Sequence, residues 1–546
     1  MAFISPKMVD LQALPQEILN QIIEHLVVVI GIQKAVMFRT VNRSFNNAIL
    51  EAICVSQVVD MYDPATPGLE YRMNPTLRGK IFAIKSRSTE ATGTSHLSVI
   101  ANVNRTLDKL VGEADEDTMK RRHELVAETV GSVYTVSQWK KGPFAPNLDA
   151  QNLLSGAIVI GSLPLVKELL ESNELSPALA DVNGDTPYFG RPLTVAATWG
   201  HIKIIQYLLD CGARPDLFSS RYGPDENATR AKWEDKDWDP QDEKSFWRVS
   251  TYRDTPLSAL SAAVLGGYED IVHLLLLPQY RLPSTKFEYL HALLAGARVG
   301  RLDLIQAIFD TLGKSLSDFP GLGNEMIWEA IASNRKEVVQ MLLDNGIDAN
   351  AFFYPGNRWY SGTLQMAAFM GHASMARFLI ERGARVNFDG LNKTGNLPIE
   401  IAARCGQEEV VQLLLEHGAD PVLALRNAAQ GGQPHMVKFL LDKYPDLPQR
   451  EDGDVGRETM WKAVASRNLL IMTILIESGV SLNEDYPHPS LLPINLAKQG
   501  AGPWVVEHLI SLGAEDTDEI ATTDKCPVNV GEVLVSERTW QWVGKF

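Results

Sequence analysis

Hydrophobic and polar positions follow two successive helical patterns in residues 387–421, which are the clearest copy of a unit that recurs along the chain. The first pattern is short, presents small apolar residues at helical spacing, and ends at Gly406, where glycine tolerates the left-handed conformation that closes a helix. Glu408 and Glu409 then lie in the first turn of the second pattern, where acidic side chains stabilise a helix. That pattern has a broad apolar face and ends at Gly418. The sequence therefore predicts two helices whose apolar faces need a neighbouring pair on each side.

The turn between the two helices recurs as a landmark residue at nearly regular intervals. Most intervals are 33 to 39 residues, which indicates tandem repeats of one helix pair. The interval of 67 residues from Gly200 to Gly267 is two periods with one landmark missing, and the interval of 26 from Gly406 to Gly432 indicates that the loop between two pairs is nearly deleted. The landmarks are Gly161, Gly200, Gly267, Gly300, Asn334, Gly371, Gly406, Gly432, Asn468 and Gly502.

The residues around the landmarks resemble the ankyrin repeat. The run PLTVAA at 192–197, followed by Gly200 and His201, matches the family's T-P-L-x-x-A-A-x-x-G-H pattern, except that Arg191 stands at the threonine position. The resemblance implies an all-α ankyrin-repeat solenoid of about ten helix-turn-helix repeats with finger loops, covering residues 149–516. It also implies that protein partners bind on a concave surface formed by the fingers and first helices.

Two loops of this array are rich in the residue types that dominate protein interfaces. One is a long insertion at 217–253 that has no helix-pair pattern, and the other is the finger AFFYPGNRWYSG at 351–362. We expect these side chains to bind a protein partner; the alternative, that they fold back and pack on neighbouring repeats, stays open. The predicted partner-binding residues are Trp233, Trp238 and Trp247 in the insertion and Phe352, Phe353, Tyr354, Arg358, Trp359 and Tyr360 in the finger.

Residues 10–50 do not follow the repeat pattern. Apolar positions at helical spacing predict a helix that ends at Gly31, then a second helix over 32–40 and a third after it. The L-P-x-E-I-L opening and the V-x-R-x-F close resemble an F-box, a small helical module that docks on the adaptor subunit of cullin-based ubiquitin ligases. By that resemblance the residues facing the adaptor are Leu14, Pro15, Ile18, Leu19, Ile22 and Leu26.

The middle of this F-box-like module departs from the family. VVVIGI stands at 27–32, where a polar turn and an Asp-Leu pair are usual. The alternative is that the module only caps the first repeat, because a repeat array needs a cap over its exposed end.

Two further regions flank the array. Residues 51–148 read as an irregular helical connection, with helices predicted over 97–111 and 117–139. Residues 517–546 form a tail whose apolar residues suit docking on the last repeat as a cap, with a free linear binding motif as the alternative.

Composition narrows the class of protein. The 546 residues carry a net charge of −16, which argues against a general nucleic-acid binder and against adsorption to an anionic membrane. The four cysteines are far apart and form no Cys-x-x-Cys, so we expect small buried thiols in a reducing compartment. The start of the chain has no signal-peptide pattern, and no apolar run is long enough to span a membrane, so we expect a cytoplasmic or nuclear protein.

Catalytic and metal-binding motifs are not evident. The loop 181–185, DVNGD, resembles a calcium loop only faintly, because Thr186 and Pro192 stand where that loop needs Gly and Glu. His201 and His372 occupy the Gly-His position of the repeat, where we expect them to help cap the second helix. We predict no catalytic residue, metal site or cofactor, and therefore not an enzyme.

Three functions follow from these patterns. The combination resembles F-box/ankyrin proteins of filamentous fungi, which implies a substrate receptor of a ubiquitin ligase: the N-terminal module recruits the adaptor and the array holds the substrate. A plain scaffold without ligase is the second hypothesis. An accessory or enzymatic role with a pocket in the groove is the third, and no motif supports it.

Overall fold

A computed structural model describes residues 15–37, 48–49, 51–55, 75–89, 95–112, 115–133, 147–172, 179–217, 258–283, 287–319, 321–351, 362–387, 397–449, 455–484, 486 and 489–516. Every regular element in these ranges is a helix, which confirms the prediction of an all-α protein. None of these helices is long and apolar enough to cross a bilayer. The chain divides into two compact units, the first reaching Ala292 and the second beginning at Leu293.

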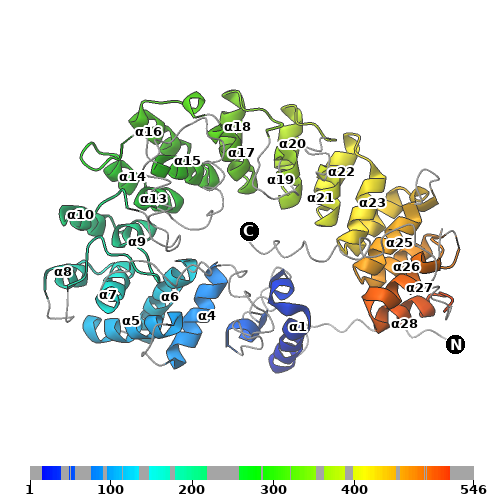
Figure 1. Ribbon diagram of the computed structural model, residues 1–546, viewed down its shortest axis with the longest axis horizontal. Coiled ribbons are helices and arrows are strands. Elements are labelled where there is room, and N and C mark those ends of the chain that lie inside the picture. Colours follow the sequence, from blue (N-terminus) through cyan, green and yellow to red (C-terminus); the bar gives the residue numbers. More distant parts are fainter. Residues whose placement is uncertain are drawn as a thin grey trace. The chain divides into compact units, whose positions relative to one another are not determined.

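Ten helix pairs follow one another in the described ranges, each with a landmark turn between its helices. In the second unit, first helices pack against the first helices of neighbouring pairs and second helices against second helices, so the pairs form two layers (Figure 1). The pairs are α7 (Leu148–Val159) with α8 (Leu163–Glu171), α9 (Pro192–Thr198) with α10 (Ile202–Asp210), α13 (Ala259–Gly266) with α14 (Glu269–Leu275), α15 (Phe287–Val299) with α16 (Leu302–Leu312), α17 (Leu322–Ala332) with α18 (Lys336–Asp344), α19 (Thr363–Met370) with α20 (Ala373–Glu381), α21 (Pro398–Arg404) with α22 (Glu408–Glu416), α23 (Pro421–Gln430) with α24 (Pro434–Lys443), α25 (Val455–Ala465) with α26 (Leu469–Glu477), and α27 (Pro493–Leu496), extended by the π-helix η9 (Ala497–Ala501), with α28 (Pro503–Ser511).

Most landmark residues adopt the left-handed conformation that the sequence predicts, but Gly502, with φ of 104° and ψ of 159°, does not. Seven of the glycines have φ between 66° and 83°, and Asn334 has φ of 56°. One landmark was placed a residue too late: Arg467 takes the left-handed turn with φ of 53°, and Asn468 is the N-cap of α26, where its side chain accepts a hydrogen bond from the Ile471 amide. Asparagine is among the best N-cap residues, which explains the shift.

The residue after several of the landmarks ties its repeat to the preceding one. His201 and His372 lie at the N-cap position, but their side chains do not cap a helix, contrary to the sequence prediction. Instead each imidazole Nε2 lies 3.3 Å from a carbonyl oxygen of the preceding repeat, that of Val159 or of Ala332. Arg335, Gln407 and Gln433 donate to the preceding repeat in the same way. These contacts hold neighbouring pairs in register.

The short interval before Gly432 has the predicted cause. The exit loop of α22 leads directly into α23, with Asp420 as N-cap and Pro421 as the first helical residue, so no finger separates the two pairs. α23 then lies very close to α21: a Cβ added at Gly431 would lie 2.0 Å from the carbonyl oxygen of Arg404. The absence of a side chain at Gly431 permits this approach.

The N-terminal helix differs from its prediction. α1 (Gln16–Met37) runs without interruption through Gly31, so the predicted break and separate second helix are wrong. A single glycine costs a helix only about 1 kcal/mol, which good helix-forming neighbours offset. α1 packs against the π-helix η3 (Glu51–Val55), which in turn contacts α4.

The connecting region is more regular than the sequence indicates. Two of its helices were predicted, and appear as α5 (His96–Val111) and α6 (Glu116–Val133); α4 (Pro75–Ser88) was missed. α4 lies so close to α6 that a Cβ at Gly79 would lie 2.7 Å from the Cα of Glu128. α5 and α6 pack on α7 and thereby cover the first helix of the first repeat.

Candidate functional site

All nine predicted partner-binding residues, and one of the predicted adaptor-binding residues, lie outside the described residues. This holds for Trp233, Trp238 and Trp247, for all six finger residues Phe352, Phe353, Tyr354, Arg358, Trp359 and Tyr360, and for Leu14. The tail 517–546 lies outside them as well. The expectations for these residues stay predictions.

α1 presents part of the predicted adaptor-binding face. Ile18 and Ile22 each expose 43% of their surface and stand one turn apart, Pro15 is exposed at the start of the helix, and Leu26 is half-buried at the edge of the same stripe. Leu19 is only 4% exposed, so it faces the interior with Ile23 and Val27, contrary to the expectation that it would face the adaptor. The helical period explains the difference, because Leu19 lies about 100° around the helix from Ile18.

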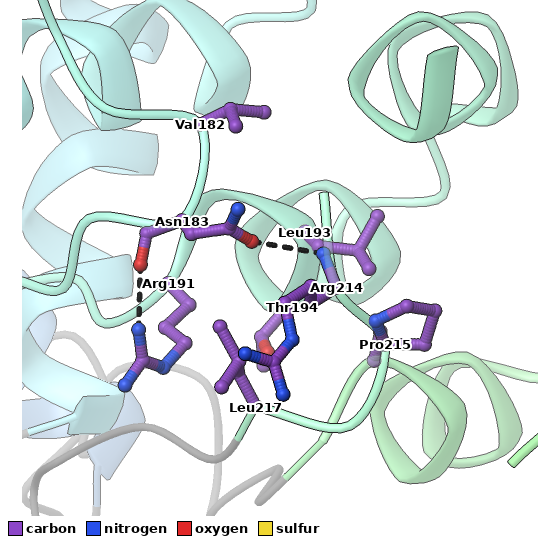
Figure 2. Close-up of a pocket in the computed structure, with 9 residues that line it drawn as sticks. Val182, Asn183, Arg191, Leu193, Thr194, Arg214, Pro215 and Leu217 are labelled. Carbon is purple, nitrogen blue, oxygen red and sulfur yellow. Dashed lines mark hydrogen bonds between the residues drawn. The ribbon is translucent and has the colours of Figure 1, made fainter. Parts of the chain in front are cut away.

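A small cavity lies at the base of the finger between the second and third helix pairs (Figure 2). The Asn183 side chain accepts a hydrogen bond from the Arg214 amide at 2.8 Å and donates to the carbonyl oxygen of Gly212 at 3.0 Å, and the Arg191 guanidinium donates to the Asn183 carbonyl oxygen. The cavity measures about 10 Å³, which is room for roughly one water molecule. It therefore cannot hold a substrate or cofactor.

The asparagine clamp in this cavity recurs along the chain. Asn350 bonds in the same way to Gly383 and Arg385, and Asn483 to Gly513 and Glu515. The resemblance of the loop 181–185 to a calcium site thus has a structural explanation: Asn183 joins two successive repeats. No group of His, Cys, Asp and Glu side chains in the described ranges could hold a metal ion.

A network of polar side chains crosses three successive first helices of the second unit. Arg404 of α21 donates to the side-chain oxygens of Asn427 and Gln430 of α23, and Lys462 of α25 donates to Gln430. We call this network the basic row; it consists of Glu400, Arg404, Arg426, Asn427, Gln430, Glu458 and Lys462.

Two cations of the basic row converge on one neutral atom. Oε1 of Gln430 lies 3.3 Å from Nη2 of Arg404 and 3.4 Å from Nζ of Lys462. Arg426 is paired with Glu458 at 2.8 Å, and Glu400 lies 3.4 Å from the Asn427 amide nitrogen. Three bases and two acids leave the row with an excess of one positive charge.

The surroundings of Lys462 and Arg404 lower the pKa of each side chain. Burial lowers the pKa of Lys462, and the nearby Arg404 and Arg426 lower it further, more than Glu458 and Glu400 can offset. Burial also lowers the pKa of Arg404. Both shifts mean that the charged forms lack part of the solvation that they would have in water, which an added anion would supply.

The basic row was not predicted from the sequence, although its three bases follow a pattern along the repeats. First helices of the repeats are short and mostly apolar, yet three successive ones carry a base in the second half of the helix, at Arg404, Arg426 and Lys462. Aligning the repeats on their landmarks places these bases two, six and five residues before the turn. Only the fold shows that such offsets bring the side chains together across adjacent helices.

Comparison with known proteins decides what the repeats are. Family profiles described as "Ankyrin repeats (3 copies)", "Ankyrin repeats (many copies)" and "Ankyrin repeat" match residues 356–424, 327–380 and 191–219. The chain carries ankyrin repeats. The matched ankyrin repeats lie in both compact units, and the basic row begins within the first of these ranges.

Relatives share the ankyrin repeats with this chain. A protein of Echinops telfairi named "Ankyrin repeat, SAM and basic leucine zipper domain-containing protein 1" is 34% identical over 124 residues, which are 21% of this chain and 25% of that protein. The protein of the same name from Mustela putorius furo is 33% identical over 152 residues, 26% of this chain and 30% of its own. The chain thus spans less than a third of the length of these relatives.

One solved structure with ankyrin repeats also aligns. The "Crystal structure of human ASB11 ankyrin repeat domain" is 20% identical, and the alignment covers 41% of this chain and 99% of that domain with a TM-score of 0.33. At this score the superposition carries no argument about function.

Proposed function

We propose that this protein is a non-enzymatic receptor that holds a protein partner on its ankyrin repeats. The observation that carries the proposal is the succession of ten helix pairs in the described ranges, together with the half-buried polar groups on the first helices of the second unit. Repeat stacks of this kind offer long surfaces and few deep cavities, which suits protein partners.

A narrower part of the proposal is that the receptor belongs to a cullin-based ubiquitin ligase, with α1 docking on the adaptor subunit and the repeats holding the substrate. Ile18 and Ile22 support this part, because they are large apolar side chains exposed on one face of a helix whose other face is buried. Exposed apolar side chains grouped in this way favour a protein contact. The receptor then acts by proximity, bringing its substrate to an enzyme bound elsewhere in the complex.

The alternative is a scaffold in which the N-terminal helices serve only as a cap. α5 and α6 already pack on α7, so the first repeat has a cover that does not require α1. This observation favours a separate role for the exposed face of α1.

Co-purification with the ligase adaptor tests the proposal. Wild-type protein is expected to form a stoichiometric complex, and the double variant Ile18→Glu/Ile22→Glu is expected to lose it. Both side chains are exposed, so each substitution should change the free energy of unfolding by no more than about 0.5 kcal/mol, and the variant should melt close to wild type. Gln16→Glu/Gln21→Glu is the matched control, because it adds two carboxylates at other exposed positions of the same helix and should leave the complex intact.

The outcomes separate the two functions. A well-folded wild-type protein that does not bind the adaptor rules out the ligase receptor and leaves the scaffold. Binding that survives the double variant shows that the face of α1 is not the contact.

A further inference from the structure

The basic row has the charge pattern of an anion site on a chain that is otherwise strongly acidic. The whole protein carries −16, whereas the row combines three bases, Arg404, Arg426 and Lys462, with two acids, Glu400 and Glu458. Long-range electrostatics therefore do not draw a polyanion such as a nucleic acid to this protein. A local excess of positive charge selects a ligand with a few, well-placed negative groups.

Gln430 marks the centre of this site. Its Oε1 accepts hydrogen bonds from both Arg404 and Lys462, and it is a neutral amide where a carboxylate would match the two cations. Hydrogen bonds to a charged acceptor are about twice as strong as those to a neutral one. The two cations thus converge on one neutral acceptor.

The row is accessible and is bordered by residues typical of binding hot spots. Arg404, Arg426, Gln430 and Lys462 are all partly exposed. Next to Lys462, the half-buried Trp461 ring lies 6.0 Å from the guanidinium of Arg457 and donates from Nε1 to the carbonyl oxygen of Leu491, which fixes the ring. Tryptophan and arginine held in this way are the residue types that contribute most to protein interfaces.

The dimensions of the row fit an extended peptide. Neighbouring helices pack about 10 Å apart, so the three helices α21, α23 and α25 span roughly 20 Å. An extended chain rises about 3.3 Å per residue, so about six residues cross the row. A segment of this length can place one acidic side chain at Gln430 and an apolar side chain at Trp461.

We propose that the basic row binds an acidic segment of a partner protein, with a glutamate or aspartate carboxylate held between Arg404 and Lys462. The inference rests on the proposed function, because it names the chemistry of the partner that the ankyrin repeats hold. It is independent of the adaptor contact, which involves α1 alone.

A binding assay on the full-length protein tests this site. The probe is a fluorescent ten-residue peptide of alternating Glu and Ser, and its control has Gln at every Glu position. The Glu peptide is expected to bind at least about tenfold more tightly, since hydrogen bonds to a charged group contribute about 1.5 to 3 kcal/mol. The double variant Arg404→Gln/Lys462→Gln should lose that preference. The double variant Lys438→Gln/Lys443→Gln, which changes two exposed lysines of α24, is the matched control for net charge and should keep the preference.

Gln430→Glu distinguishes binding from folding. The new carboxylate would accept from Arg404 and Lys462 as the ligand does, so the variant is expected to melt at a higher temperature and yet to lose the preference for the Glu peptide. A variant that only damages the fold would lose both stability and binding. Retention of the Glu preference in Gln430→Glu overturns the assignment.

Further outcomes are also decisive. Equal binding of the Glu and Gln peptides by wild-type protein refutes an anion site. A third peptide with phosphoserine in place of serine and Gln in place of Glu tests a phosphate ligand, and binding of this peptide alone replaces the carboxylate assignment. Adaptor binding that persists when peptide binding is absent refutes only this inference, whereas peptide binding without adaptor binding refutes only the ligase role.

Discussion

Two adjacent glycines, Gly431 and Gly432, follow α23. Backbone conformation alone suggests that alanine destabilises the protein more at Gly432, but we expect the larger loss of stability at Gly431. Gly432 is left-handed with φ of 66°, a conformation that costs alanine about 1 to 2 kcal/mol. Gly431 has φ of −78° and ψ of −4°, which any residue adopts, and there alanine would stabilise the protein by about 0.4 to 1 kcal/mol if space allowed.

Space decides the outcome. A Cβ at Gly431 would lie 2.0 Å from the carbonyl oxygen and 2.8 Å from the carbonyl carbon of Arg404, and these are backbone atoms that cannot rotate away. At Gly432 the nearest atom is Nδ2 of Asn468 at 3.6 Å, an ordinary contact. Forcing α21 and α23 apart should cost about 3 kcal/mol, the upper end of the range for overpacking. We expect Gly432→Ala to cost about 1 kcal/mol net, after the unfolded-state gain.

Urea unfolding of the two variants beside wild-type protein, followed by far-ultraviolet circular dichroism, measures the difference. The slopes should be compared first, since a changed slope would signal a changed unfolding unit rather than a changed stability. If Gly431→Ala is as stable as wild type, or loses less than Gly432→Ala, then the close approach of α21 and α23 is not as the structure has it.

Three further predictions concern the asparagine clamp, a half-buried histidine and a half-buried thiol. Asn350→Ala removes the bonds to Gly383 and Arg385 and should cost about 1 to 2 kcal/mol in urea unfolding, with Asn350→Asp intermediate because it keeps the acceptor; no loss would contradict the clamp. Burial, helped by Arg78, lowers the pKa of His96 from 6.5 to about 4, so the folded state holds the neutral ring. The free energy of unfolding is therefore expected to be constant above pH 6.5 and to fall by about 3 kcal/mol as the pH drops to about 4, because the unfolded chain binds the proton more tightly. His96→Phe keeps a ring between Phe82 and Tyr188 and should make the free energy of unfolding depend less on pH than in wild type. Burial raises the pKa of the Cys405 thiol to about 11, whereas Cys211 is exposed, so iodoacetamide labelling at pH 8 followed by peptide mapping should modify Cys211 well before Cys405; equal rates would contradict the burial of Cys405.

The cysteines illustrate a partial success of sequence reasoning. Both lie at helix ends in the repeats, and both were expected to be buried. Cys405 is half-buried, and Cys211 is exposed at the C-cap of α10. Position along a repeat predicts the end of a helix, but whether that end is covered depends on the neighbouring loop.

The N-terminal region shows a limit of local patterns. The apolar stripe from Ile18 onward predicted a helix, and the glycine within it predicted a break that does not occur. Likewise the resemblance that placed Leu19 with Ile18 and Ile22 did not specify which side of the helix the protein itself would bury. A helix has one buried face, and only packing against another element selects it.

The sequence by itself determined the repeat architecture of this protein. The positions of Gly371, Gly406 and the other landmarks follow from local backbone energetics, since few residues other than glycine and asparagine tolerate the left-handed turn. The period and the apolar faces follow from the need of each pair to bury itself against its neighbours.

Tertiary structure alone decided which polar side chains meet. Arg404, Gln430 and Lys462 are separated by 26 and 32 residues along the chain, and the deleted finger between α21 and α23 alters their register. Their convergence depends on the close approach at Gly431 and on side-chain directions across three helices. Distances of this kind arise from packing between repeats, and no pattern within a single repeat encodes them.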